Sequence, residues 1–157
     1  MSEIYYINLV NLLNANPNCV ETIKGQYLVL LSELTLTNFI ETEIFLNNIE
    51  RINEMGTIMV AIRYDAFNNL EIIGSGTIII EPKIIREGKS VGHIEDIVVA
   101  KHMRGKGICS NIIEILKEFA KKNNCYKIIL NCSNNVKKVY KKNGLEAKGI
   151  SMAEYFD

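Results

Sequence analysis

Residues 93–110 read HIEDIVVAKHMRGKGICS, and this stretch decides the fold because it runs from an apolar strand through a basic turn into a helical pattern. The turn, residues 104–107, holds two glycines and two cations. A helix that begins after such a turn leaves its first backbone N–H groups unpaired and directed at one spot. The sequence therefore predicts an anion-binding turn here. An ordinary exposed turn is the alternative interpretation.

Two adjacent carboxylates, Glu95 and Asp96, interrupt the strand that leads into this turn. The rest of residues 94–99 is Ile and Val, which suits a strand buried on both faces. A β-bulge would explain the interruption, because it inserts an extra residue and re-aims unpaired backbone groups. We therefore expect a bulge at the two carboxylates, with free backbone N–H groups at residues 97–99.

The composition fits one cytosolic domain over residues 1–157. An apolar content of 48% is sufficient for a hydrophobic core. Eighteen basic and eighteen acidic residues balance, so no overall field favours nucleic acid or an anionic membrane. No apolar run is long enough to span a bilayer, and Met1-Ser2-Glu3 lacks the basic start of a secretory signal.

Four cysteines and two histidines are too dispersed to predict a metal centre. The cysteines form no Cys-x-x-Cys pair, and only His93 and His102 could join them. We therefore expect no metal and reduced thiols, as in most cytosolic chains.

The residues before the opening stretch predict a strand, two helices and a hairpin. The strand is expected at residues 4–9, the first helix from about residue 27 to Thr35, and the second from Thr37 as N-cap. The buried side of that second helix is predicted to be Ile40, Ile44, Leu46 and Ile49. The hairpin joins residues 57–64 and 70–81 through a five-residue loop and ends at Pro82.

The residues after the turn predict two more helices and two more strands. Apolar residues at helical spacing indicate a helix over 108–123. A strand is expected at 127–132, a short helix at 134–142 and a last strand at 150–156. This order of elements is typical of a mixed α/β sheet.

The strand and turn resemble the acyl-coenzyme A signature of the GNAT superfamily of N-acetyltransferases, Arg/Gln-x-x-Gly-x-Gly/Ala. The match departs at Cys109, where the signature has a small residue. Over residues 28–152 the chain is further similar to the glucosamine-6-phosphate N-acetyltransferase family. The segments that carry this similarity are 31–35, 78–85, 93–97, 104–107, 124–130 and 140–144.

The resemblance implies a GNAT-type fold, with a mixed and largely antiparallel central sheet flanked by helices. It implies acetyl-CoA-dependent N-acetylation of D-glucosamine 6-phosphate, a step in UDP-N-acetylglucosamine biosynthesis, by direct transfer in a ternary complex without a metal. It also implies a homodimer in which the second subunit completes the sugar pocket. The alternatives are an enzyme that acetylates another amine, such as a polyamine or a protein N-terminus, and a non-catalytic acyl-CoA-binding sensor.

The resemblance also implies the site residues. Tyr140 would protonate the leaving thiolate, although a tyrosine on an amphipathic helix can serve packing alone, and Asp96 and Asn131 would act on the amine. The cofactor would contact Ile97, Val98, Val99, Arg104, Gly105, Lys106, Gly107, Ile108, Cys109, Ser110, Tyr140 and Lys142. The sugar phosphate would contact Thr35, Lys83, Arg86, Glu95, Asp96, Tyr126, Lys127 and Tyr155.

Two positions depart from the family on the acceptor side. Asn131 stands where relatives carry an acidic residue, and Tyr155 aligns with an arginine near their C-terminus. An amide exerts less electrostatic pull on an amine than a carboxylate does, and a phenol cannot supply a positive charge. The phosphate contact is therefore expected to rest on Lys83, Arg86 and Lys127.

Overall fold

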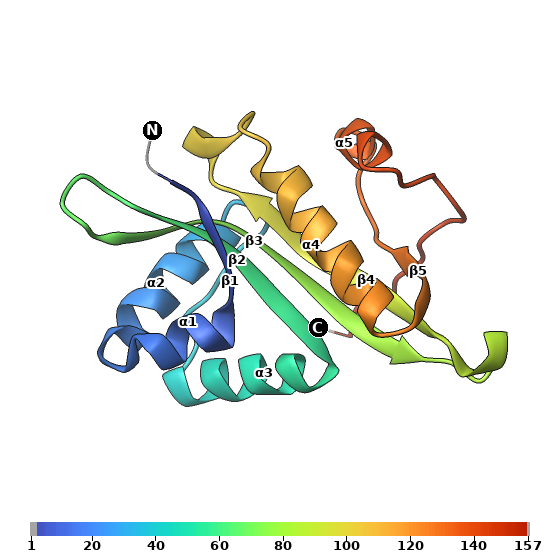
Figure 1. Ribbon diagram of the computed structural model, residues 1–157, viewed down its shortest axis with the longest axis horizontal. Helices are drawn as coiled ribbons and strands as arrows, with labels where there is room; N and C mark the ends of the chain where they lie inside the picture. Colours follow the sequence, from blue (N-terminus) through green and yellow to red (C-terminus); the bar gives the residue numbers. More distant parts are fainter. Residues whose placement is uncertain (1–2, 157) are drawn as a thin grey trace.

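The computed structural model describes residues 3–156 and contains a five-stranded sheet with helices on both faces (Figure 1). The strands lie in chain order and are β1 (Tyr5–Asn8), β2 (Gly56–Tyr64), β3 (Leu70–Pro82), β4 (Ser90–Val99) and β5 (Cys125–Ile129). All neighbours are antiparallel except β4 and β5, which are parallel. The predicted fold class, a mixed and largely antiparallel GNAT-type sheet, is confirmed.

The helices divide between the two faces of the sheet. Three helices precede β2 in the chain, namely α1 (Leu9–Ala15), α2 (Val20–Leu31) and α3 (Thr42–Met55). Figure 1 shows these three gathered on one face, whereas α4 (Ile108–Lys122) crosses the other. The short helix α5 (Lys137–Lys142) follows β5. Single 3₁₀ turns occupy Pro17–Cys19, Arg86–Gly88 and Lys101–Met103.

Helix α4 packs closely on the sheet and confirms the helix predicted over 108–123. Its buried positions recur three or four residues apart, as an amphipathic helix requires, and are Ile108, Ile112, Ile113, Leu116 and Ala120. Gly76 of β3 lies beneath it: a Cβ there would come within 2.5 Å of the Ile97 side chain and 2.6 Å of Ile112. The absence of a side chain at this position lets the helix approach the strand.

The N-terminal prediction is wrong beyond residue 8. The strand ends at Asn8, whose side chain accepts a hydrogen bond from the Asn11 N–H at 3.1 Å and caps α1. The next helix, α2, begins at Val20 and ends at Leu31 rather than near Thr35. The residues after it form tight turns, in which the Glu33 and Leu34 N–H groups donate to the carbonyls of residues 30 and 31.

The second predicted helix begins at Thr42, not after Thr37. Glu41 is its N-cap, and the hydroxyl of Thr37 instead donates to the Leu28 carbonyl at 3.4 Å. The buried side is Phe45 and Ile49, whereas Ile44 is 52% exposed and Ile40 lies outside the helix. The prediction is therefore confirmed for Ile49 and for Leu46, which packs partly buried against the core, and is wrong for Ile40 and Ile44.

The predicted C-terminal strand is absent, because residues 150–156 adopt no helix or strand. A strand needs the backbone of a neighbour for its hydrogen bonds, and this segment pairs with none in the described chain. Its large apolar side chains are therefore exposed, and they are Ile150, Met152, Tyr155 and Phe156. The elements before it are also displaced from the predicted positions: β5 ends at residue 129 rather than 132, and α5 begins at 137 rather than 134.

Candidate active site

The predicted bulge in β4 is confirmed. Ser75 of β3 lies opposite Val98, and Thr77 lies opposite Glu95, so three steps along β4 match two along β3. The extra residue falls at Asp96, whose φ of 52° is in the left-handed region. Both carboxylates are exposed.

Beyond the bulge, one edge of β4 is open. The strand pairs with β5 only from Ser90 to His93. At its end the Ala100 N–H donates to the Ile73 carbonyl of β3 at 2.9 Å, so by strand alternation the N–H and C=O of Val99 face away from β3. An extended ligand could therefore hydrogen-bond this edge, as another strand would.

The turn that follows is built on backbone conformation. Gly105 and Gly107 have φ of 77° and 80°, and a Cβ at either would meet nothing within 4 Å. Glycine is needed there because L side chains disfavour positive φ, not because space is short. Gly107 is the N-cap of α4, so the first N–H groups of that 15-residue helix open onto the turn beside Arg104 and Lys106.

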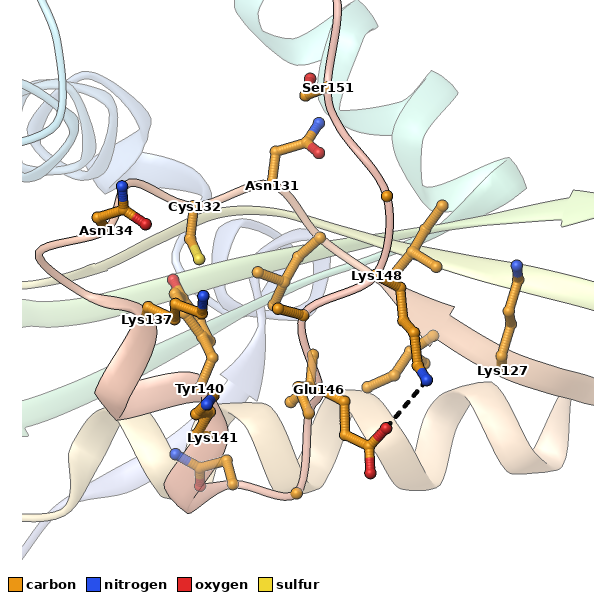
Figure 2. Close-up of a pocket in the computed structure, with 18 of the residues that line it drawn as sticks. Lys127, Asn131, Cys132, Asn134, Lys137, Tyr140, Lys141, Glu146, Lys148 and Ser151 are labelled. Atoms are coloured by element: carbon orange, nitrogen blue, oxygen red, sulfur yellow. Dashed lines mark ion pairs between the residues drawn. The ribbon is translucent and has the colours of Figure 1, made fainter.

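Tyr140 projects from α5 toward Cys132 (Figure 2). Burial raises the pKa of its phenol to about 12, with smaller contributions from Cys109 and Cys132. Burial likewise raises the pKa of the Cys109 thiol, in the first turn of α4. The Tyr140 hydroxyl is therefore protonated at neutral pH and can donate a hydrogen bond or a proton.

A cavity of about 660 Å³ lies between β5, α5 and residues 143–151 (Figure 2). Three predicted site residues line it, namely Lys127, Asn131 and Tyr140. Asn134 also lines it, and no sequence pattern had selected that residue. The lining is strongly basic, with Lys117, Lys127, Lys137, Lys141 and Lys148, and Glu146 pairs with Lys148 at 3.2 Å. Such a cavity suits an anionic ligand.

Two of the predicted phosphate-binding cations meet at one aromatic ring. The Arg86 Cζ and the Lys127 Nζ each lie 5.5 Å from the centroid of the Tyr126 ring. Arg86 and Glu87 both have positive φ, 57° and 60°, in the turn before β4. Consecutive left-handed residues are strained, and strain of this kind is concentrated at functional sites.

The third predicted cation, Lys83, is engaged elsewhere. Its ammonium pairs with Glu81, which also contacts the His93 Nε2 at 2.6 Å. The hydrogen bond from Lys83 lowers the pKa of the Glu81 carboxyl most, and that from His93 lowers it further. The charge of Lys83 is thus partly neutralised within the chain.

Three predicted contacts are not brought into this group. Thr35 is exposed in the turns after α2, and Lys142 is exposed at the end of α5, outside the cavity. Tyr155 is 86% exposed. Each would need a further element, or a different arrangement of the C-terminal segment, to reach the residues above.

A buried polar pair beneath the bulge was missed from the sequence. The Ser75 hydroxyl donates to the Tyr27 oxygen at 3.3 Å, and both side chains are buried. Burial raises the pKa of Tyr27, the hydrogen bond with Ser75 opposes that rise, and the charge of Asp96 adds to it. The sequence pattern that could have predicted this pair is the presence of two hydroxyl residues, Ser75 and Thr77, inside the otherwise apolar β3.

Within residues 3–156, no group of three or more His, Cys, Asp or Glu side chains is placed to hold a metal ion. No helix in the same range is long and apolar enough to cross a membrane. The four cysteines are unpaired.

The open bulged strand and glycine turn coincide with a family match. Residues 28–145 match the model of the Acetyltransferase (GNAT) family. The chain belongs to this family.

Its relatives include named enzymes. The chain is 36% identical over 131 residues to glucosamine 6-phosphate N-acetyltransferase of Arabidopsis thaliana, covering 83% of this chain and 88% of the relative. It is 39% identical over 129 residues to glucosamine 6-phosphate N-acetyltransferase 1 of Dictyostelium discoideum, covering 80% and 79%. The crystal structure of the Arabidopsis thaliana enzyme superposes with a TM-score of 0.83 at 30% identity over 99% of both chains.

Proposed function

We propose that this chain transfers the acetyl group of acetyl-CoA to D-glucosamine 6-phosphate, giving N-acetyl-D-glucosamine 6-phosphate for UDP-N-acetylglucosamine biosynthesis. The observation that carries the proposal is the bulge at Asp96, which opens β4 beside the glycine turn. It occurs in a chain 36% identical to an enzyme of this name.

The residues of the turn and open edge fit acetyl-CoA. The cosubstrate supplies an activated thioester, an extended amide chain and a pyrophosphate. Amides of that chain can pair with the open edge of residues 97–99, where the Val99 carbonyl already accepts from the Arg104 Nε at 3.0 Å and the Val99 N–H is left for the ligand. The pyrophosphate suits the N-terminus of α4 beside Arg104 and Lys106. No side chain at Gly105 or Gly107 obstructs the approach. Residues 108–110 would contribute the helix's first turn, whereas Lys142 could add a charge only if α5 were arranged differently.

The chemistry requires three contributions from the protein. The amine attacks the thioester carbonyl directly in a ternary complex, and the developing oxyanion accepts from a backbone N–H at residues 97–99. A donor of this kind contributes about 2.7–4 kcal/mol of transition-state stabilisation. Tyr140 protonates the departing thiolate, and the proton that the attacking nitrogen loses as it becomes an amide returns to the Tyr140 oxygen. Asp96 and Asn131 orient the amine, which must be neutral to attack.

The sugar phosphate is assigned to the cations around Tyr126. Arg86 and Lys127 offer a guanidinium and an ammonium to the phosphate dianion. Lys83 contributes less, because Glu81 already binds it. Thr35, Glu95 and Tyr155 contact the sugar only if a second subunit or a rearranged C-terminal segment closes over it.

We also propose a cytosolic homodimer in which residues 1–157 form one N-acetyltransferase domain. Several large apolar side chains support an interface, since Ile84, Ile150, Met152 and Phe156 are at least 92% exposed. Large exposed apolar side chains of this kind are available for contacts with another subunit. Unpaired cysteines are compatible with the reducing cytosol.

Gly107→Val is expected to weaken acetyl-CoA binding about tenfold, because a β-branched residue at φ 80° is strained by about 1–2 kcal/mol and distorts the turn. Calorimetry with CoA measures the effect. Gly25→Ala is the matched control, since Gly25 lies within α2 and a Cβ there meets nothing within 4 Å. Equal CoA affinity in folded Gly107→Val protein would remove the turn from the cofactor site.

Thiol release from acetyl-CoA with a panel of amines tests the function as a whole. We expect release with glucosamine 6-phosphate well above that with spermidine or a peptide N-terminus. Preference for one of those amines would establish the alternative enzyme. CoA binding without release to any amine would establish a sensor.

A further inference from the structure

The turn that precedes Thr35 is tied to the cofactor turn through one carboxylate. Glu33 Oε2 accepts from the Arg104 Nη2 at 2.9 Å, and Glu33 Oε1 accepts from the Lys101 backbone N–H at 3.2 Å. These partners are 68 and 71 residues away in the chain. The Glu33 side chain is 25% exposed, so it lies mostly against protein.

Both bonds act on the segment that shapes the turn. Lys101 begins the 3₁₀ turn Lys101–Met103, whose N-cap, Ala100, has no side-chain cap. A first-turn N–H has no partner within its own helix, and Glu33 supplies one from outside. Arg104 follows directly, and its Nε donates to the Val99 carbonyl at 3.0 Å. Two of its nitrogens are thus fixed, which holds the planar guanidinium in one orientation.

We propose that Glu33 is a positioning residue for the cofactor, acting through Arg104 and Lys101 to hold the turn in its binding shape. The inference rests on the function proposed above, since it concerns the pyrophosphate turn of that same site. Both Glu33 oxygens are engaged by the two groups it fixes, and Glu33 partly neutralises Arg104, as Glu81 does Lys83. Its contribution to binding therefore comes from the orientation of the guanidinium and not from charge. Without it, Arg104 must be ordered during binding, and the start of the 3₁₀ turn loses its partner.

Binding of CoA to wild-type and variant protein tests this inference. We expect Glu33→Ala to raise the Kd for CoA about tenfold, as befits loss of a charge-assisted pair. Glu33→Gln retains an acceptor for the Lys101 N–H and should raise it only about threefold. Glu54→Ala, which removes an exposed charge from α3, is the control and should leave Kd unchanged. At saturating acetyl-CoA, kcat of Glu33→Ala should stay close to wild type.

A double-mutant cycle separates positioning from a general structural role. Because the contact with the Lys101 N–H remains, Glu33→Ala should add only about threefold to Kd in an Arg104→Ala background. A full tenfold effect in that background, or an unchanged or lower Kd in folded Glu33→Ala protein, would overturn the inference. If Glu33→Ala fails to fold, Glu33→Gln alone decides, with no change in Kd as the contrary result. Failure of wild-type protein to bind CoA would instead overturn the proposed function.

Discussion

Tyr140→Phe is expected to lower kcat by about 10²–10⁴ while leaving KM for both substrates near wild type. The ring and its packing are retained, and only the hydroxyl is lost. A free thiol has a pKa near 8.5, so a thiolate released at neutral pH is stabilised by a positioned donor. Steady-state kinetics measure both constants.

Tyr64→Phe is the matched control for this substitution. Tyr64 ends β2, is 41% exposed and lies in the hairpin remote from α5. It should leave kcat unchanged. Wild-type kcat in Tyr140→Phe would reduce Tyr140 to a packing residue.

The pKa of Tyr140 also predicts the pH profile. Because burial raises that pKa to about 12, the hydroxyl is protonated at every pH below it. The donor is therefore retained as pH rises from about 7 to 10, while deprotonation of the amine favours attack. We expect kcat not to fall over this range in wild-type protein. A fall in kcat with an apparent pKa near 10, absent from Tyr140→Phe, would contradict the buried assignment.

The second large effect is expected at the phosphate. Changing both Arg86 and Lys127 to Ala should lower kcat/KM for glucosamine 6-phosphate by about 10²–10⁴, since each charge-assisted contact contributes about 1.5–3 kcal/mol. The loss should lie mainly in KM. With unphosphorylated glucosamine the same variant should change little, because that sugar has no phosphate to bind.

Charge-matched substitutions control for the loss of two cations. Arg51 and Lys122 are exposed in α3 and α4, and changing both to Ala should leave the ratio between the two sugars unchanged. Lys83→Ala should have a smaller effect than either Arg86→Ala or Lys127→Ala, because Lys83 is paired with Glu81. An equal loss of kcat/KM for both sugars would mean that Arg86 and Lys127 support the fold and do not bind the phosphate.

Local chemistry made the centre of the fold predictable. Two carboxylates inside an Ile and Val strand have few explanations other than a bulge, and Asp96 lies at one. The two glycines of the turn are required by their positive φ, which a short sequence motif captures. Helix α4 follows from apolar spacing alone, because one face is buried against the sheet along its length.

The wrong predictions concern segments whose structure depends on contacts with distant parts of the chain. Helix α1 packs against the core through Leu9, Leu12 and Leu13. It follows β1 directly, so the sequence alone shows no boundary between the strand and the helix. Residues 150–156 have the apolar pattern of a strand and lack a pairing partner within the described chain. Contacts between distant segments, such as Glu33 with Arg104 or Ser75 with Tyr27, leave no local pattern.

Transfer from acetyl-CoA labelled with ¹³C in the acetyl group tests the central claim most directly. The protein would receive equal concentrations of glucosamine 6-phosphate, glucosamine and spermidine, and NMR would identify the labelled amide. We expect the label to appear first and predominantly on the 2-amino group of glucosamine 6-phosphate. Label on spermidine, equal label on both sugars, or CoA binding without any labelled amide would contradict it.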